Sequence, residues 1–403
     1  MSRTAGTPGF FRAGGLAVLA ALLLAACAAP GPSATTATSA AVRPEEVCPG
    51  VNAPRLAGAQ PSPQLNSQFT AYGNRSTNSD WSGADGTYSV RLPDGRMLWS
   101  FGDTILGPVN ADGSRTNGVK WVKNSFVVQR GAQLSTIYTD SDPPTGVVNP
   151  PGDPEQRWYW PVGMTVSDST LNVVYVQIRQ APGNFGFNGE KNVLVRLSLP
   201  DFRVLSTSDV PSGKPHLHYG AWIQRDGGYT YVYGVEDIPG GSGQLTRKYM
   251  HIARVQGTDL RGSWEFYTNP GWSADAAKSA RVLEGVANGY SVTKLDRVYM
   301  LLTHDSTTGF SDKIVALFSC TPTGPFVGKT VVYQTPESGQ SGSYHDPDIY
   351  TYNARVHPGL SSSDGRRVVV SYNVNSFAGI PGDVYKDVSI YRPRFVDLDF
   401  SGR

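Results

Sequence analysis

The chain has 403 residues, and its 35 Lys and Arg nearly balance its 33 Asp and Glu, which gives a formal net charge of +2. This balance offers no strongly basic surface for nucleic acid or for an anionic membrane, so we expect no nucleic-acid partner. The 45 Gly, 29 Pro and 20 Tyr, together with only 17% charged residues, are typical of a globular protein rich in β-strands and turns.

The first 26 residues have the pattern of a bacterial lipoprotein signal peptide. Arg3 and Arg12 form a basic start, and the apolar run 16–24 is too short to cross a membrane comfortably. A Leu-Ala-Ala-Cys sequence then ends at Cys27 and predicts lipidation of that cysteine. An ordinary signal peptide with an incidental cysteine is the alternative. We therefore expect export and a lipid anchor on the outer face of the bacterial cell membrane.

Residues 27–42 are mostly Ala, Ser, Thr and Pro, a composition that predicts a flexible tether. The remaining stretch, 43–403, is long enough for one large domain with a substantial core, which we expect to be a monomer. It contains two further cysteines, Cys48 and Cys320. In an exported protein two such cysteines are expected to pair, and two separate buried thiols are the alternative.

Residues 43–403 consist of short alternating or fully apolar runs separated by turns, a pattern typical of an all-β domain. One short helix is expected near 274–281. Five turns recur at intervals of about 60 to 75 residues, each between an aromatic-rich strand and an apolar one. This repeat predicts a five-bladed β-propeller, and a pair of β-sandwiches is the alternative. The five turns are Asp94-Gly95, Ser167-Asp168, Asp226-Gly227, Leu295-Asp296 and Asp364-Gly365.

A pair of aspartates, Asp85 and Asp103, flanks the first predicted hairpin, in which a Pro-Asp-Gly turn joins strands at 87–91 and 97–101. Side chains on the same face of such a hairpin lie about 5 Å apart at Cβ. Two carboxylates at about that separation suit a retaining glycosidase, in which one attacks and the other acts as acid and base. The alternative is that both only bond to nearby turn amides.

A set of short motifs lies along the chain: Asp85-Gly86-Thr87-Tyr88-Ser89, Phe101-Gly102-Asp103-Thr104, Asn124-Ser125, Tyr219-Gly220-Ala221, and His357-Pro358-Gly359-Leu360 followed by Ser371-Tyr372-Asn373. These motifs resemble a family of bacterial and phage five-bladed propellers that includes endo-D-arabinanases. The resemblance spans the mature chain and implies a propeller fold, a furanoside substrate and Asp85 and Asp103 as catalytic candidates.

Two further acids, Glu236 and Glu284, are candidates for the proton donor. Each stands next to aliphatic residues, where a carboxylate must be hydrogen-bonded or protonated. The alternative is a salt bridge to Arg254 or Arg281.

Seven residues are predicted to bind substrate because they fall where the propeller strands would converge. Aromatic rings can stack on the C–H faces of sugars, although core packing is the alternative for each of them. The Tyr344–Asp348 segment could also hold a hard cation or form only a turn. The seven residues are Asn124, Trp160, Tyr219, Trp222, Tyr290, His345 and Asp346.

The sequence therefore predicts a lipid-anchored glycoside hydrolase that cleaves arabinofuranosyl linkages in an arabinan polysaccharide, acting within the polymer. No cofactor or catalytic metal is expected, and a structural cation in the channel is left open. A surface lipoprotein that binds carbohydrate without cleaving it is the alternative, because the fold alone does not determine function.

Overall fold

The structure is a computed structural model that describes residues 46–75, 81–182, 186–240, 246–379 and 381–401, all within the compact unit Pro44–Arg403. The predicted signal peptide, Cys27 and the tether lie outside the described residues. Within the described ranges, no helix is long and apolar enough to span a membrane.

Five antiparallel sheets follow one another along the chain. Sheet I consists of β5 (Tyr88–Arg91), β6 (Met97–Phe101), β9 (Ser125–Arg130) and β10 (Gln133–Ile137). Sheet II consists of β11 (Arg157–Ser167), β12 (Thr170–Gln180), β13 (Phe187–Ser198) and β14 (Val204–Val210). Sheet III consists of β15 (Leu217–Asp226), β16 (Tyr229–Ile238), β17 (Arg247–Gln256), β18 (Trp264–Tyr267), β19 (Trp272–Ser273) and β20 (Leu283–Glu284). Sheet IV consists of β21 (Tyr290–Leu295), β22 (Val298–His304), β23 (Lys313–Ser319) and β24 (Val327–Gln334). Sheet V consists of β25 (Ile349–Val356), β26 (Arg367–Ser376), β27 (Pro393–Ser401) and β3 (Arg55–Pro61).

The five predicted turns all join the first strand of a sheet to its second strand. In sheet I the turn is tight, with the Leu92 N–H donating to Arg96 O and the Gly95 N–H to Leu92 O. The positive φ of 86° at Gly95 explains why glycine is suited there. The expected all-β class is therefore confirmed, and the predicted repeat corresponds to the repeat of the sheets.

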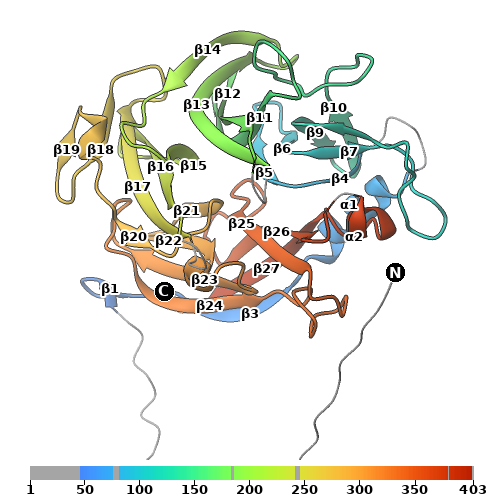
Figure 1. Ribbon diagram of the computed structural model, residues 1–403. Helices are drawn as coiled ribbons and strands as arrows, with labels where there is room; N and C mark the ends of the chain where they lie inside the picture. Colours follow the sequence, from blue (N-terminus) through green and yellow to red (C-terminus); the bar gives the residue numbers. More distant parts are fainter. Residues whose placement is uncertain (1–45, 76–80, 183–185, 241–245, 380, 402–403) are drawn as a thin grey trace, which may run out of the picture. The chain divides into compact units, whose positions relative to one another are not determined.

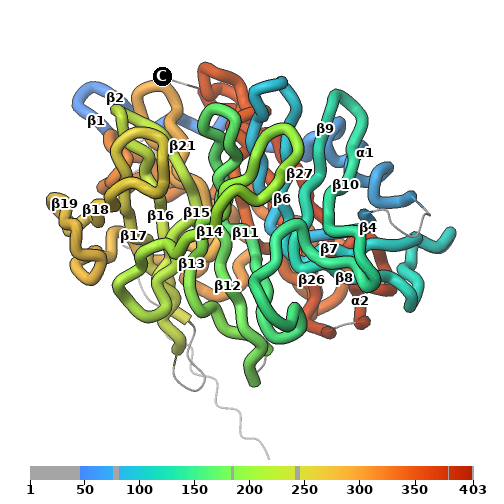
Figure 2. The backbone as a smooth tube through the Cα atoms, turned by 90° about the horizontal axis from the view of Figure 1, so that it is seen from above, coloured from blue at the N-terminus to red at the C-terminus, as the bar shows by residue number. Residues whose placement is uncertain are grey.

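The sheets stand side by side in chain order within this unit, as Figures 1 and 2 show. The first strands of successive sheets are neighbours: β5 lies beside β11, β11 beside β15, β15 beside β21 and β21 beside β25. Sheet V returns to sheet I, because the imidazole Nδ1 of His357 lies 2.7 Å from Ser89 Oγ in β5. This order leaves sheet I between sheets II and V.

The hydrophobic core is divided among the interfaces between neighbouring sheets. Because strand side chains alternate between two faces, each sheet can bury apolar residues against both of its neighbours. Leu98 and Val173 lie between sheets I and II, Val232 and Leu194 between II and III, and Ile252 and Val315 between III and IV. Continuous apolar runs in the second and third strands therefore mark burial on both faces.

The start of the described chain completes sheet V from outside, because β3 pairs with β27. The short strands β1 (Glu46–Cys48) and β2 (Val51–Asn52) precede it and form a hairpin. Cys48 is bonded to Cys320, just after β23, across a sequence separation of 272 residues. The predicted disulfide is confirmed, and it ties the start of the domain to sheet IV.

Two elements between sheets I and V were not predicted. Helix α1 (Pro63–Gly73) packs Leu65, Phe69 and Tyr72 into this interface, with the Phe69 ring centroid 5.2 Å from that of Trp99. These residues are spaced at i, i+4 and i+7, a pattern in the sequence from which the helix could have been predicted. A three-stranded sheet of β4 (Trp81–Ala84), β7 (Thr104–Leu106) and β8 (Lys120–Val122) lies next to it.

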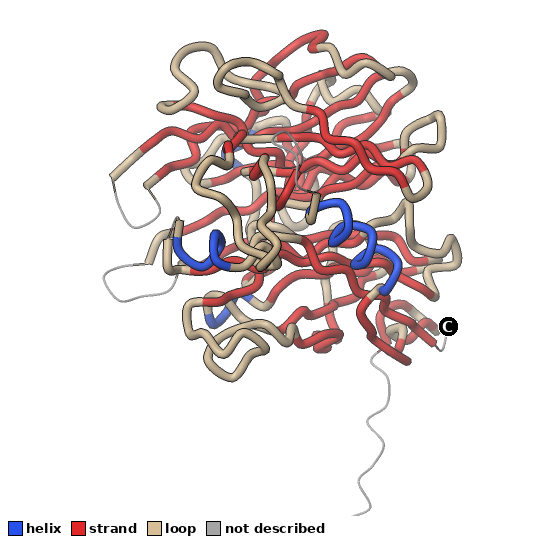
Figure 3. The backbone as a smooth tube through the Cα atoms, turned by 90° about the vertical axis from the view of Figure 1, so that its right-hand side faces the viewer, coloured by secondary structure: helices blue, strands red, loops and turns tan. Residues whose placement is uncertain are grey.

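The other helical segments are short (Figure 3). The helix expected near 274–281 is one 3₁₀ turn, Ala276–Lys278, which begins where the Asp275 side chain accepts from the Ala277 N–H. A second 3₁₀ turn covers Ser306–Thr308, and α2 covers Gly382–Lys386.

Arg355 in β25 is a buried charged residue that joins several sheets. Its side chain is 2% exposed; Nε donates to Gly86 O at 2.9 Å and Nη1 to Ala221 O at 3.3 Å. Its guanidinium carbon lies 3.5 Å from the Tyr88 ring centroid, and Nη2 donates to the Tyr88 hydroxyl. One side chain of sheet V thus bonds to sheet III and to the segment that enters sheet I.

We predict that Arg355→Met lowers the free energy of unfolding by about 2–5 kcal/mol, because it leaves two buried carbonyls and a hydroxyl without a donor. Urea unfolding followed by fluorescence measures the change. Arg366→Met, at a side chain 79% exposed, is the control and should change stability by less than about 0.5 kcal/mol. Equal stability of both variants would contradict this role.

We predict that Cys48→Ser combined with Cys320→Ser lowers stability by about 2–4 kcal/mol, because the unfolded chain gains the freedom of a long open loop. Denaturant unfolding of the double variant and of the reduced natural protein should give the same loss. An unchanged midpoint in both would show that the pairing of β3 alone holds this end of the domain.

Candidate functional site

Asp85 and Asp103 lie opposite each other at the base of the first hairpin. Strands β4 and β7 are antiparallel and pair Ala84 with Thr104. Asp85, which follows Ala84, therefore lies opposite Asp103, which precedes Thr104. The Asp85 N–H lies 3.4 Å from Asp103 O, and the Gly102 N–H donates to Asp85 O at 2.9 Å. The predicted placement of the two aspartates at matching ends of the hairpin is therefore what the structure shows.

Gly102 and Trp160 lie beside the two carboxyl groups. A Cβ added at Gly102 would lie only 2.7 Å from Asp85 Oδ1 and 3.7 Å from the indole Cδ1 of Trp160. The same indole donates from Nε1 to Asp103 Oδ1 at 2.8 Å. Trp160 therefore borders Asp103, and glycine at position 102 leaves the space that the Asp85 carboxyl group occupies.

The surroundings of Asp85 favour its protonated form. Burial, and after it the negative charge of Asp103, raise the pKa of Asp85 to about 7. Hydrogen bonds from Tyr352 and Tyr391 and the charge of Arg355 act in the opposite direction and lower this pKa. The Tyr352 hydroxyl donates to Asp85 Oδ2 at 2.8 Å. Near neutral pH, Asp85 can therefore hold a proton and release it.

Asp103 has cationic and donor groups of its own. Burial raises the pKa of Asp103 above its ordinary value, and the charge of Lys123 and the hydrogen bond from Trp160 offset only part of this rise. The Lys123 ammonium lies 4.0 Å from Asp103 Oδ1 and 4.6 Å from the ring centroid of Trp158. The Asp103 side chain remains 19% exposed. Asp103 is thus the carboxyl group of the pair that has a lysine beside it, which favours its anion against the effect of burial.

The two environments assign different chemical roles to the pair. A carboxyl group that keeps its proton near pH 7 can act as a general acid, and a neighbouring carboxylate can act as a nucleophile or base. Pairs of carboxyl groups whose environments push their pKa values apart are typical of acid–base sites. A pair of this kind can supply a proton donor and an anion to a reaction that cleaves a bond.

Sequence reasoning missed the residues that create these environments: Tyr352, Tyr391, Lys123 and Arg355. Tyr352, Arg355 and Tyr391 come from segments far from the hairpin in the sequence, and only folding brings them to it. A signal was present in 349–356, where two tyrosines, a threonine, an asparagine and an arginine stand among apolar residues. Such polar groups on the face of a buried strand need partners, which here are Asp85 and the segment after it.

The structure places Glu236 and Glu284 in ion pairs in sheet III. Glu236 is 6% exposed and accepts from Arg281 Nε at 2.5 Å and from His251 Nε2 at 3.1 Å. The hydrogen bond from Arg281 lowers the pKa of Glu236. Glu284 accepts two hydrogen bonds from Arg247, at 2.7 and 2.8 Å. In the described part of the chain, neither glutamate forms a hydrogen bond or an ion pair with Asp85 or Asp103.

Of the predicted substrate-binding residues, Trp160 is the one that contacts the aspartate pair. Asn124 is buried and bonds to the backbone of Val148 and Tyr159. Tyr290 donates to Gly234 O at 2.9 Å, and the Tyr219 hydroxyl lies 2.8 Å from Ser279 Oγ. These three side chains hold neighbouring strands together.

Trp222 is half-buried and packs against two core clusters. His345 is exposed, with a φ of 53° in the turn before β25. In the described part of the chain, neither Trp222 nor His345 forms a hydrogen bond, ion pair or ring contact with the aspartate pair, and their roles in substrate binding stay predictions.

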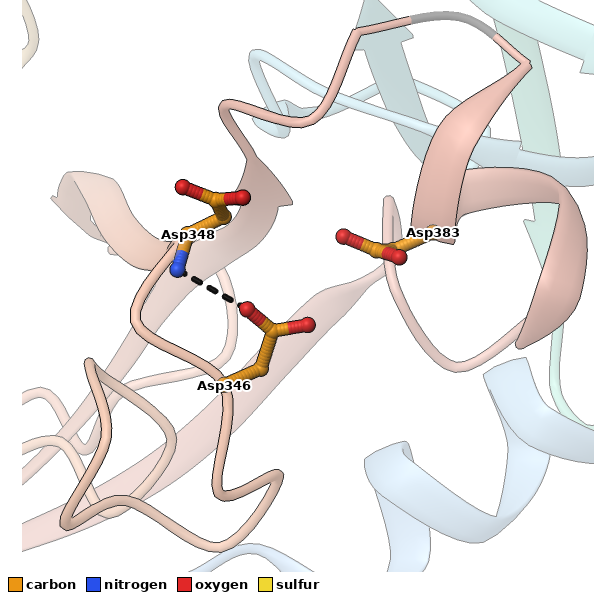
Figure 4. Close-up of side chains that lie close together, drawn as sticks. All are labelled: Asp346, Asp348 and Asp383. Carbon is orange, nitrogen blue, oxygen red and sulfur yellow. Dashed lines mark hydrogen bonds between the residues drawn. The ribbon is translucent and has the colours of Figure 1, made fainter. Parts of the chain in front are cut away.

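Asp346 belongs to a group of three carboxylates with Asp348 and Asp383, whose oxygens lie within 4.8 Å of one another (Figure 4). The Asp348 N–H donates to Asp346 Oδ1 at 2.9 Å. Asp383 accepts from Ser376 Oγ at 2.6 Å and pairs with the Lys386 ammonium at 3.0 Å. Lys386 thus supplies a positive charge within this group, which anchors the end of β26.

The chain belongs to the family described as Domain of unknown function (DUF5005), which matches residues 66–399. Comparison with curated proteins gives no match. A "putative hydrolase" from Bacteroides ovatus has a similar structure, with a TM-score of 0.69, 22% identity, and 88% of this chain and 93% of that chain covered. At this identity the likeness concerns the fold.

Weaker similarity extends to a xylan β-1,4-xylosidase from Bacillus halodurans, with a TM-score of 0.46, 12% identity, and 80% and 54% of the two chains covered. An α-L-arabinofuranosidase from Clostridium thermocellum has a TM-score of 0.42 and 12% identity, with 77% and 87% covered.

We predict that Asp85→Asn stabilises the protein increasingly as the pH rises from 4 to 7. The folded pKa of about 7 lies above the ordinary value of 3.8. The natural protein therefore loses about 1.4 kcal/mol per pH unit from this group in that window and no more above it. Asparagine does not titrate, so thermal unfolding midpoints of the variant and the natural protein should diverge up to about pH 7.

Asp94→Asn is the matched control, because the Arg96 hydrogen bond lowers the pKa of Asp94 instead of raising it. The difference in thermal unfolding midpoint between Asp94→Asn and the natural protein should not grow between pH 4 and 7. A constant difference for Asp85→Asn would show that Asp85 is ionised throughout.

Proposed function

We propose that this protein is a glycoside hydrolase in which Asp85 is the acid and base and Asp103 is the nucleophile. The observation that carries the proposal is the pairing of two carboxyl groups with different environments: one kept protonated, the other beside Lys123 and the Trp160 N–H. Cleavage of a glycosidic bond requires such a pair on the two sides of the bond.

In the first step the Asp103 carboxylate bonds to the anomeric carbon and the glycosidic C–O bond breaks. The bonding electrons go to the leaving oxygen, which takes the proton of Asp85. In the second step Asp85, now ionised, removes a proton from water, and the hydroxide displaces Asp103 and regenerates both groups. Tyr352 and Tyr391 position Asp85 and stabilise its ionised form between the two steps.

The proposed substrate is an arabinan polysaccharide with arabinofuranosyl linkages. Support comes from the motifs around Asp85 and Asp103, which resemble those of endo-D-arabinanases. The five sheets are interpreted as the five blades of a β-propeller whose blades I, II and V meet at the aspartate pair. With the predicted lipid on Cys27, the enzyme would act at the outer face of the bacterial cell membrane.

We expect Asp85→Asn and Asp103→Asn each to lower the rate of hydrolysis at least about a hundredfold, because each removes one of the two groups that carry protons or form the covalent bond. The purified protein is incubated with arabinogalactan, lipoarabinomannan, plant arabinan and fructan, and released oligosaccharides are measured by mass. Circular dichroism checks that both variants fold, and Asp94→Asn serves as the active control.

Full activity of either variant would refute the mechanism. Binding to one polymer without release of products, unchanged in both aspartate variants, would support the non-catalytic carbohydrate-binding protein in its place. Activity of the natural protein should also fall as the pH rises above about 7, where Asp85 loses its proton.

A further inference from the structure

An exposed group of aromatic rings lies next to Asp85 in sheets IV and V. It consists of Phe310, Tyr350 and Phe377, which we call the aromatic platform. The Tyr350 and Phe377 rings are stacked, with centroids 4.1 Å apart, and Phe310 lies 4.5 Å from Tyr350 and 5.3 Å from Phe377. Phe310 comes from the segment after β22. Tyr350 lies in β25, opposite Asn375 of β26, and Phe377 follows the end of β26.

The exposure of this platform is unusual for the molecule. Phe310 is 52% exposed and Phe377 is 49% exposed, and among the described residues no other phenylalanine is classed as exposed. Large apolar rings gathered in water are typical of a surface that binds a ligand. Because the flat rings present C–H-binding faces with few hydrogen-bond donors, a sugar ring suits them better than an ion.

The platform is connected to the aspartate pair through Tyr352. The Tyr350 and Tyr352 ring centroids are 5.3 Å apart, and Tyr352 donates to Asp85. Asn375 Nδ2 also donates to the Tyr352 hydroxyl at 3.3 Å, from the strand opposite Tyr350. Tyr352 therefore lies between the platform and the residue that we propose as the acid.

A second group of rings borders the other aspartate. Trp160 donates to Asp103, and its ring centroid lies 4.6 Å from that of Phe187 and 5.8 Å from that of Trp158. These residues belong to sheet II, whereas the platform belongs to sheets IV and V. Because sheet I stands between sheets II and V, aromatic rings flank the aspartate pair on both sides.

We propose that the polysaccharide extends across the aspartate pair, with sugar rings bound at Trp160 on one side and on the aromatic platform on the other. This inference rests on the proposed function and adds the binding path of the substrate. Contacts on both sides of the cleaved bond favour cleavage within a polymer, because a substrate that ends at the aspartates forgoes one set of contacts.

The test compares Phe377→Ala and Phe310→Ala with the natural protein on arabinofuranosyl oligosaccharides of two to six residues. We expect kcat/KM to fall about tenfold for the longer oligosaccharides and little for the disaccharide, since the disaccharide need not reach the platform. Phe377→Tyr keeps a ring and should retain activity. Leu205→Ala, at a side chain 53% exposed in sheet II, is the matched surface control.

An equal loss of kcat/KM for all oligosaccharide lengths, or no loss for any length, would overturn the proposed role of the platform. The aspartate variants separate this result from the proposed function. If Asp85→Asn and Asp103→Asn abolish cleavage while the phenylalanine variants behave like Leu205→Ala, the hydrolase proposal stands and the platform fails. If the aspartate variants remain fully active but the phenylalanine variants show the length-dependent loss, the platform stands and the assignment of the aspartates fails.

Discussion

The buried guanidinium of Arg355 is the interaction on which the arrangement of this molecule depends. A planar group with five donors can satisfy several carbonyls at once, and here it bonds to Gly86 and Ala221 from sheet V. Gly289, just before sheet IV, has no room for a Cβ because Arg355 Nη2 fills that space. The fixed position of Gly86 also fixes Asp85, so the same contact that joins the sheets places the candidate acid.

The electrostatics of the site follow from this arrangement. Asp85 is desolvated between sheets I and V and lies beside a second carboxyl group, and both effects raise its pKa. Burial also raises the pKa of Asp103, but the charge of Lys123 and the hydrogen bond from Trp160 of sheet II offset part of that rise. Two aspartates of one hairpin thus acquire different properties because different neighbouring sheets complete their surroundings.

Much of the fold could be predicted from local sequence. Strand 97–101 was predicted with the bounds that β6 has, and the five turns each join the first two strands of a sheet. The strand predicted at 87–91 corresponds to β5, which begins one residue later, at Tyr88, because Thr87 has a positive φ of 38°. Helix α1 was missed, since its short apolar stripe is stabilised by Trp81 and Phe395 from distant segments.

The sequence by itself determined the all-β class, the repeat of the hairpins, the pairing of Cys48 with Cys320 and the placement of Asp85 opposite Asp103. All of these depend on short-range periodicity, turn chemistry or the small number of cysteines. Only the tertiary structure decided that Tyr352, Tyr391 and Lys123 surround the aspartates, that Glu236 and Glu284 pair with arginines, and that Phe310 joins Tyr350 and Phe377. Those contacts join residues that are not neighbours in the sequence, and burial and charge act through space without a fixed spacing in the sequence.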